Sequence, residues 1–313
     1  GVRLFSFGVG YDVNTKLLDK IAEENSGTAE YVEPKEDLEI KVSNFFSKVN
    51  SPVLTDLELN FGGLQTDLLY PRKNPDLFRG SQITMIGRYK NSSDLRDITL
   101  KLSGKAGREV RTFNYENLSF PLRAEDNNFL PRLWATRRVG WLMEQIRSNG
   151  DNKEVRDEVV ELGTRFGIVT PYTSYLATDG SERRENRDLP RPASGGFSRL
   201  PEANRAVVDL ASGQEAVQMS KNAKKQQDAE KVEDKPISTR VQNVGTKTFY
   251  LDSTGFWVDS EYKAEKKLTE ISVKFASSGY FDLIAANKEI GQILALGEQI
   301  VFVWNGKVYR ITK

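Results

Sequence analysis

The sequence contains neither cysteine nor histidine. These absences exclude thiol nucleophiles, serine-histidine-aspartate triads, imidazole general bases, and zinc sites built from thiolate or imidazole. The side chains that remain for chemistry are carboxylates, lysine, tyrosine and hydroxyl groups. Because no disulfide can form, the cysteine count indicates neither an oxidising nor a reducing compartment.

Long apolar runs are missing as well. No stretch approaches the roughly 20 consecutive apolar residues that span a bilayer, so we expect no membrane span in this chain. The opening Gly1-Val2-Arg3-Leu4-Phe5 is not a charged-then-apolar signal peptide, and there is no initiator methionine. Because the chain opens directly on strand-like sequence, we expect it to be a fragment of a longer protein.

An excess of charge of one sign is the third absence. The 45 lysines and arginines nearly balance the 44 aspartates and glutamates, and the formal net charge is +1. Such a chain has no overall field that steers it toward nucleic acid or anionic lipid, so no nucleic-acid partner is expected. Its 313 residues exceed one typical domain, which predicts two or three folded units in an α+β multidomain protein.

The first predicted segment covers residues 1–52. Alternating apolar residues predict a strand over 2–9, and apolar residues at helical spacing predict a helix over 14–25. Asn14 or Thr15 can cap this helix, and Gly27 is expected to end it. A strand at 29–32 and a helix at 38–49 follow. This order is typical of the last part of a doubly wound α/β sheet.

The second predicted segment covers residues 53–177. Four strands joined by turn-rich sequence indicate an antiparallel β-sandwich; they span 55–61, 82–89, 98–103 and 108–115. Two strong helices follow at 129–147 and 153–166. The polar residues between them predict a helical hairpin.

The last two predicted segments are a linker and a small module. Residues 178–236 are charged, punctuated by glycine and proline and poor in aromatics, which indicates a linker. A helix within 204–231 is expected to be weakly packed, because its apolar positions fade after Met219. Residues 237–313 predict a small C-terminal α+β module.

The elements of that module are indicated by strand-like runs around one helical stretch. The helix is predicted over 278–296, and the strands over 240–244, 247–251, 256–259, 271–275, 299–304 and 307–311. Asn305-Gly306 separates the last two strands, and this pair accepts the positive φ angles of a tight β-turn.

Two blocks of the sequence resemble known proteins. Residues 1–60 resemble the end of a von Willebrand factor type A domain, through Leu4-Phe5-Ser6-Phe7-Gly8-Val9-Gly10, Asp12-Val13-Asn14, and Leu17-Leu18 to Ala22. The run from Phe5 to Asn14, with Pro52-Val53-Leu54-Thr55-Asp56, resembles the inter-alpha-trypsin inhibitor heavy chain branch. A second block supports this, through Arg132-Leu133-Trp134-Ala135 and Phe166-Gly167-Ile168-Val169-Thr170-Pro171-Tyr172-Thr173-Ser174.

The resemblance implies a non-enzymatic scaffold or adhesion-type protein-protein interaction module. It covers roughly residues 1–176, while the C-terminal module resembles tails of bacterial members. The implied location is extracytoplasmic (periplasmic, cell surface or secreted), and the implied partner is a protein or an extracellular matrix or surface ligand. Two alternatives stay open: an architectural envelope spacer and a carboxylate-based hydrolase.

The resemblance also implies a divalent cation, Mg²⁺, in the full-length type A domain. That family binds its metal through an Asp-x-Ser-x-Ser loop, a threonine and a later aspartate, and all three would lie upstream of Gly1. We therefore predict no cofactor and no metal-ligating residue in this chain. Thr178-Asp179-Gly180 is interpreted as a turn, and Gly8-Val9-Gly10-Tyr11-Asp12 as a strand-end turn instead of a phosphate-binding loop.

Carboxylate pairs are the remaining route to catalysis. Asp56 with Glu58 and Glu125 with Asp126 lie beside predicted strands and turns, where solvated surface is the default interpretation. We predict no catalytic residues.

Basic residues gather in two places. Arg132, Arg137, Arg138 and Arg147 share one predicted helix, and Arg183, Arg184, Arg187 and Arg191 follow later. Because Glu144, Glu182 and Glu185 dilute both groups, a solvated helix face is favoured over binding of an anionic polymer. Trp134 and Trp141 share a face of the first helix and are predicted as core.

Overall fold

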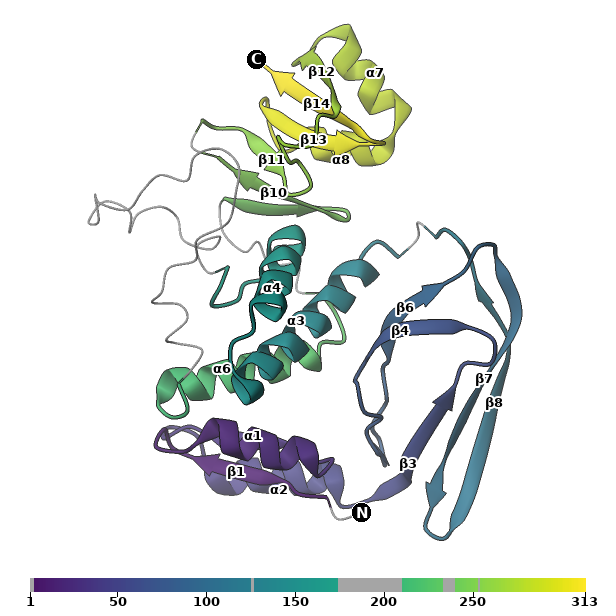
Figure 1. Ribbon diagram of the computed structural model, residues 1–313, viewed down its shortest axis with the longest axis vertical. Helices are drawn as coiled ribbons and strands as arrows, with labels where there is room; N and C mark the ends of the chain where they lie inside the picture. The colour runs from purple at the N-terminus through teal and green to yellow at the C-terminus, as the bar shows by residue number, and fades with distance from the viewer. Residues whose placement is uncertain (1–2, 125–126, 174–209, 233–239, 253) are drawn as a thin grey trace. The chain divides into compact units, whose positions relative to one another are not determined.

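The computed structural model describes residues 3–124, 127–173, 210–232, 240–252 and 254–313 (Figure 1). The chain forms two compact units. Unit 1 contains Gly1–Gly150 and Val208–Lys231, and unit 2 contains Asp151–Val207 and Val232–Lys313. The chain therefore passes from unit 1 to unit 2, returns, and leaves again, an interleaving that the sequence did not predict. The described elements form a mixed α+β protein, and no described helix has the length and apolar character to cross a membrane.

Unit 1 begins with four elements in the predicted order, of which the first strand, predicted over 2–9, is shorter and begins at Ser6. They are β1 (Ser6–Val9), α1 (Thr15–Glu24), β2 (Ala29–Val32) and α2 (Leu38–Val49). The two strands pair in parallel, from Ser6 opposite Ala29 to Val9 opposite Val32. The Asn14 side chain accepts a hydrogen bond from the Leu17 amide at 3.0 Å and so caps α1 as predicted.

The end of α1 differs in detail from the prediction. Ser26, not Gly27, has the left-handed φ angle, at 54°. Gly27 is required for another reason, since a Cβ atom there would lie 1.8 Å from the carbonyl oxygen of Leu4. This glycine allows the chain after α1 to pass close to the start of β1.

Six strands follow in unit 1 and form two sheets. They are β3 (Pro52–Asn60), β4 (Gln65–Tyr70), β5 (Leu77–Phe78), β6 (Ile86–Lys90), β7 (Leu95–Ala106) and β8 (Glu109–Phe120). One sheet has the order β5-β3-β7-β8, and β4 pairs with β6 in a separate ribbon. The sequence did not predict β4 and β5. The strand predicted at 82–89 is the shorter β6.

Two helices complete unit 1, namely α3 (Leu130–Asn149) and α6 (Gln214–Gln227), which pack against each other and against α1. Helix α6 lies in the stretch predicted as a linker with a weakly packed helix. The structure differs, because a face of small residues is buried: Ala216, Val217, Ser220 and Ala223 are at most 5% exposed. Small side chains let helices approach closely without the stripe of large apolar residues that usually indicates a packed helix.

Unit 2 consists of one mixed six-stranded sheet and three described helices. The helices are α4 (Lys153–Phe166), α7 (Ser278–Ala286) and α8 (Lys288–Leu294). The strands are β9 (Val241–Val244), β10 (Lys247–Leu251), β11 (Trp257–Asp259), β12 (Thr269–Lys274), β13 (Ile300–Trp304) and β14 (Lys307–Thr312). Their order in the sheet is β12-β14-β13-β11-β10-β9.

The core of unit 2 is apolar and fully enclosed. Its most buried side chains, all 0% exposed, are Phe249, Ile293, Ile300, Phe302 and Ile311. The closing turn has the predicted positive φ angles, 47° at Asn305 and 74° at Gly306.

The helices of unit 2 differ from the prediction in one respect. The single helix predicted over 278–296 is two helices, because Asn287 is extended and its side chain caps α8 by accepting from the Glu289 amide at 2.7 Å. Helix α4 occupies the predicted residues. Because α3 and α4 belong to different units, the predicted hairpin between them stays a prediction.

Candidate binding surface on the four-stranded sheet

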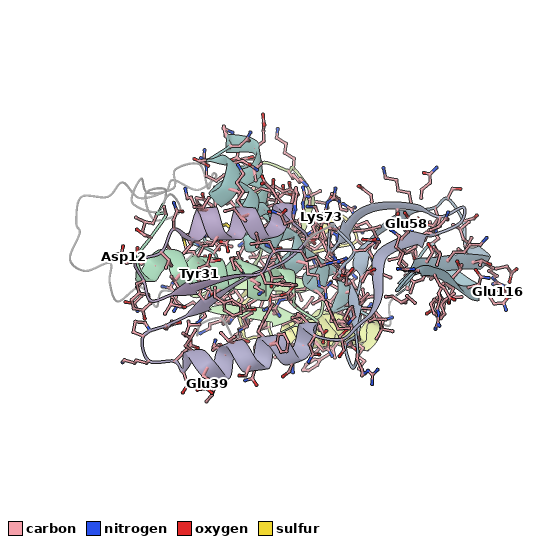
Figure 2. All side chains as sticks on the ribbon, turned by 90° about the horizontal axis from the view of Figure 1, so that it is seen from below. Asp12, Tyr31, Glu39, Glu58, Lys73 and Glu116 are labelled. Atoms are coloured by element: carbon pink, nitrogen blue, oxygen red, sulfur yellow. The ribbon has the colours of Figure 1, made fainter. Side chains whose placement is uncertain are left out.

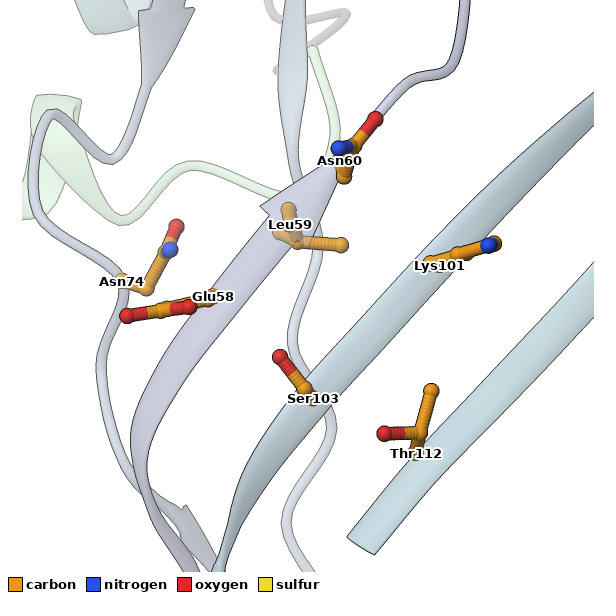
Figure 3. Close-up of a pocket in the computed structure, with 7 residues that line it drawn as sticks. All are labelled: Glu58, Leu59, Asn60, Asn74, Lys101, Ser103 and Thr112. Atoms are coloured by element: carbon orange, nitrogen blue, oxygen red, sulfur yellow. The ribbon is translucent and has the colours of Figure 1, made fainter. Parts of the chain in front are cut away.

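The face of the four-stranded sheet holds an open hollow of about 580 Å³ (Figure 3). Strands β3, β7 and β8 and the loop after β4 contribute its lining. All lining residues except Leu59 are polar: Glu58, Asn60, Asn74, Lys101, Ser103 and Thr112. The hollow combines a carboxylate, an ammonium group, two amides and two hydroxyls.

Strand register gathers these side chains. Ser103 of β7 lies opposite Glu58 of β3 on one side and opposite Thr112 of β8 on the other. The next row places Asn60 opposite Lys101. Because side chains alternate between the two faces of a sheet, residues two positions apart share a face. Polar residues at every second position of neighbouring strands thus form a continuous polar surface.

Two amide side chains are anchored at the edge of the hollow. Asn74 Nδ2 donates to the Leu57 carbonyl at 2.8 Å, and Asn60 Oδ1 accepts from the Gly62 amide at 2.8 Å. Both bonds hold side chains that line the hollow, which lowers the conformational entropy lost when a ligand binds. The group types present donate and accept hydrogen bonds, as a peptide or a hydroxyl-rich ligand requires.

Asp56, which forms a carboxylate pair with Glu58 in the sequence, contacts two positively charged side chains. Its Oδ2 accepts from Lys105 Nζ at 2.9 Å, and Arg3 Nη2 lies 3.6 Å from its Oδ1. The hydrogen bond from Lys105 lowers the pKa of Asp56. An ionised carboxylate has no proton to donate, so Asp56 is not suited to act as the general acid beside Glu58. Glu125 and Asp126 lie outside the described residues.

Arg147 is buried, so the predicted solvated helix face is wrong at this position. Its side chain is 0% exposed and donates to Asp19 Oδ2 at 3.1 Å, Glu144 Oε2 at 3.2 Å and Thr15 Oγ1 at 2.9 Å. The reason is that α3 is covered on more than one side, by α1, by α6 and by β4. The positive charge of Arg147 is therefore paired inside the fold and is not presented at the surface.

Asp19 extends this buried cluster to β2 and α6. Tyr31 donates to Asp19 Oδ1 at 2.8 Å, and Ser220 donates to Asp19 Oδ2 at 2.7 Å. Burial raises the pKa of Tyr31 and also that of Glu144. Tyr31 is 3% exposed, and Figure 2 labels it in the part of unit 1 that holds α1 and α2. The cluster ties α1 and β2 to the helices α3 and α6, which come much later in the sequence.

Arg137 is also buried, at 3% exposure, and the predicted solvated face is wrong for it too. Its Nε donates to the Ala229 carbonyl at 2.7 Å, and its Nη1 donates to the Thr84 carbonyl at 2.7 Å. Burial lowers the pKa of Arg137. This guanidinium donates to carbonyl groups inside the fold and does not face an anionic polymer.

The two tryptophans of α3 are half-buried. Trp134 Nε1 donates to the Leu68 carbonyl at 3.1 Å. The guanidinium groups of Arg138 and Arg72 lie 5.2 Å and 5.6 Å from the Trp141 ring centre. The rings therefore pack partly against arginine side chains, and the predicted core position is only partly reached.

Of the remaining residues that the sequence singled out, some lie inside the described ranges and others outside them. Gly8 lies within β1. Gly10, with a φ angle of 78°, turns the chain directly after that strand, as a strand-end turn requires. The described ranges contain no group of acidic residues arranged to hold a metal ion. Several candidates lie outside the described residues: Thr178, Asp179, Gly180, Glu182, Arg183, Arg184, Glu185, Arg187 and Arg191.

Comparison with known proteins gives one consistent likeness. The chain is 27% identical over 202 residues to human inter-alpha-trypsin inhibitor heavy chain H4, which covers 61% of this chain and 22% of that protein. It is 27% identical over 215 residues to mouse inter alpha-trypsin inhibitor, heavy chain 4 (65% and 23%), and 25% identical over 195 residues to human heavy chain H3 (59% and 22%). No family model matches the chain. The chain thus spans under a quarter of the length of these relatives.

Proposed function

We propose that this chain is a non-catalytic, adhesion-type protein-binding segment of a protein related to the inter-alpha-trypsin inhibitor heavy chains. The similarity to those heavy chains over 61% of the chain carries the proposal. The proposed partner is a protein or an extracellular matrix or surface ligand. The proposed setting is bacterial and extracytoplasmic, in the periplasm, at the cell surface or secreted.

In this proposal residues 1–52 are the end of a von Willebrand factor type A domain. The parallel pairing of β1 with β2, with α1 between them, supports this assignment. The four-stranded sheet and the β4–β6 ribbon are the proposed β-sandwich that follows. Mg²⁺ is proposed to bind in another part of a longer protein, where the resemblance to the type A family places the Asp-x-Ser-x-Ser loop.

The sheet hollow is the proposed contact surface for the partner. It is open, and its single carboxylate, Glu58, is balanced by its single ammonium group, Lys101. Interfaces between proteins that also exist apart are about as polar as the rest of the protein surface. A neutral, hydrogen-bonding surface on a long sheet fits a peptide or polar protein face.

Site-specific photo-crosslinking tests the contact surface. The protein carries a benzophenone amino acid in place of Ser103 and is photo-crosslinked in a bacterial cell-envelope protein extract. The adducts are identified by mass spectrometry. We expect reproducible adducts that disappear when Lys101→Glu is added in the hollow. Lys48→Glu on α2, an exposed lysine outside the hollow, is the matched control and should leave them unchanged. Adducts that survive Lys101→Glu, or no adducts at all, argue against the hollow.

Two further measurements test the non-catalytic and metal parts of the proposal. Titration calorimetry with Mg²⁺ and with Mn²⁺ should give no saturable binding to this chain, and tight binding would contradict the proposed location of the cation. Hydrolysis of a polysaccharide panel should be absent. Turnover that is lost in Glu58→Gln would replace the binding proposal with the hydrolase alternative.

A further inference from the structure

Strand β8 is an open edge of the four-stranded sheet. Among the described strands only β7 pairs with it. Every residue from Glu109 to Asn117 is exposed. Figure 2 shows Glu116 at the margin of the β-rich part, where side chains project outward. The outer side of such a strand presents backbone N–H and C=O groups that a further strand can pair with.

Half of this edge lacks the usual protection against pairing. Edge strands are commonly guarded by bulges, prolines or lysines. In β8 the register with β7 is regular from Glu109 to Tyr115, and the irregularities lie beyond it, near Leu118 and Asn117 (φ 59°). Residues 109–115 contain no proline and no lysine, and their two charged residues, Glu109 and Arg111, precede an uncharged run from Thr112 to Tyr115. A regular stretch without a guarding residue therefore remains available from Thr112 to Tyr115.

Large side chains on this stretch are exposed to solvent. Val110 is 69% exposed, Phe113 41% and Tyr115 50%. Single exposed apolar residues are ordinary, but Phe113 and Tyr115 lie two positions apart and so share one face of an open edge strand, where they offer a joint contact surface.

A second copy of the stretch can pair with it without placing like charges opposite each other. Residues 109–115 carry one negative charge, at Glu109, and one positive charge, at Arg111. An antiparallel pair centred on Phe113 places Phe113 opposite Phe113 of the second copy and Arg111 opposite Tyr115 of the second copy. Aromatic pairs and cation–aromatic pairs across strands are favourable. Registers centred on Glu109 or Arg111 place like charges opposite each other and are disfavoured.

We propose that two copies of this protein associate through their β8 strands, antiparallel and centred on Phe113, so that the two four-stranded sheets become one. This self-association surface is separate from the hollow and does not depend on the proposed binding function. The hollow uses Thr112 on one face of β8, and the central contact uses Phe113 on the other face. A variant that no longer self-associates can therefore still be tested for partner binding in the hollow, and a variant that loses partner binding can still be tested for self-association.

Sedimentation velocity of the full chain over a concentration series tests the association. We expect a monomer–dimer equilibrium in the unchanged protein, and at least tenfold weaker association in Phe113→Lys, which puts two ammonium groups opposite each other. Ile40→Lys on α2, where the side chain is 59% exposed, is the matched control and should dimerise normally. Circular dichroism of each variant confirms that it folds.

The absence of native cysteine permits a direct test of register. Single-cysteine variants Phe113→Cys and Thr112→Cys are oxidised mildly and separated without reducing agent. The centred register brings only the two residues at 113 face to face, so we expect Phe113→Cys to form the covalent dimer far faster than Thr112→Cys. This readout also holds if Phe113→Lys fails to fold.

Three results would overturn the proposal. One is a protein that stays monomeric across the series. Another is a dimer that Phe113→Lys does not weaken, with no preferential cross-link at position 113. The third is a monomer whose β8 instead pairs with an extended peptide of another protein, which would assign the edge to a different occupant.

Discussion

Gly140 of α3 and Gln227 of α6 approach so closely that no side chain fits between their helices. A Cβ atom at position 140 would lie 2.7 Å from the Gln227 amide nitrogen and 2.8 Å from the Ala223 carbonyl oxygen. Both neighbours are backbone atoms, which cannot rotate away. The close contact between α3 and α6 therefore requires glycine at position 140, because even the methyl group of alanine would clash.

Gly140→Ala is expected to lower the free energy of unfolding of unit 1 by about 1–3 kcal/mol, the usual cost of overpacking. Alanine favours a helix over glycine by about 1 kcal/mol, so a loss of stability would show that steric strain outweighs propensity. Urea unfolding measures the change. Gly63→Ala, where nothing lies within 4 Å of an added Cβ, is the control and should be close to neutral. Equal stability of the two variants would argue against the close contact.

Arg147→Met is expected to destabilise unit 1 by about 3–5 kcal/mol, because it leaves buried carboxylates without their cation. The affected groups are Asp19 and Glu144, whose side chains are 11% exposed. Chemical denaturation provides the measurement. Lys105→Met removes a cationic partner of Asp56 at the surface, where the Lys105 side chain is 57% exposed, and should cost much less than Arg147→Met. Similar losses in both variants would mean that Arg147 is not buried as described.

Stability should depend on pH through Glu144. Burial raises its pKa above the ordinary value of 4.5, although Arg147 acts in the opposite direction and Asp19 adds to the increase. The folded state then binds more protons than the unfolded state between 4.5 and the raised pKa, so this contribution to stability falls as pH rises through that window. The unchanged protein should lose stability relative to Glu144→Gln across it. Unfolding curves at a series of pH values measure the difference, and a pH-independent difference would contradict the raised pKa.

Asp259→Ala is expected to destabilise unit 2 by about 3–5 kcal/mol. The Asp259 side chain is 0% exposed, and its Oδ2 accepts from Lys247 Nζ at 2.8 Å and from the Val303 amide at 3.0 Å. Its removal leaves the Val303 amide without this acceptor, and leaves the buried Lys247 ammonium group with Glu261 Oε2, at 2.6 Å, as its remaining carboxylate partner. Asp282→Ala, an exposed position on α7, is the control and should change stability little. Thermal unfolding distinguishes the two.

Local chemistry made much of the fold predictable. The caps at Asn14 and the turn at Asn305-Gly306 depend on neighbouring residues only, and the structure has both. Long periodic helices such as α4 were predicted to the residue. The single helix predicted over 278–296 failed because a capping residue, Asn287, interrupts an otherwise continuous apolar pattern.

Contacts between distant segments were not predictable. Arg147 and Asp19 are 128 residues apart, and neither has a local signal that announces an ion pair. The same holds for the hollow: Glu58 was considered, but its neighbours across β7 and β8 become neighbours only through strand register. Alternating polar residues at 58 and 60 and at 101 and 103 were the available signal.

The hydrogen bond between Ser220 and Asp19 joins residues that are 201 positions apart, which has a consequence during synthesis. At about 5–20 residues per second, the ribosome completes α6 some 10–40 s after α1 and β2 have been made. Throughout that interval Ala22 and Tyr31 lack the helix that later covers them. The nascent chain must therefore stay unaggregated with an unfinished first unit while the first part of the second unit's sequence, Asp151–Val207, is translated.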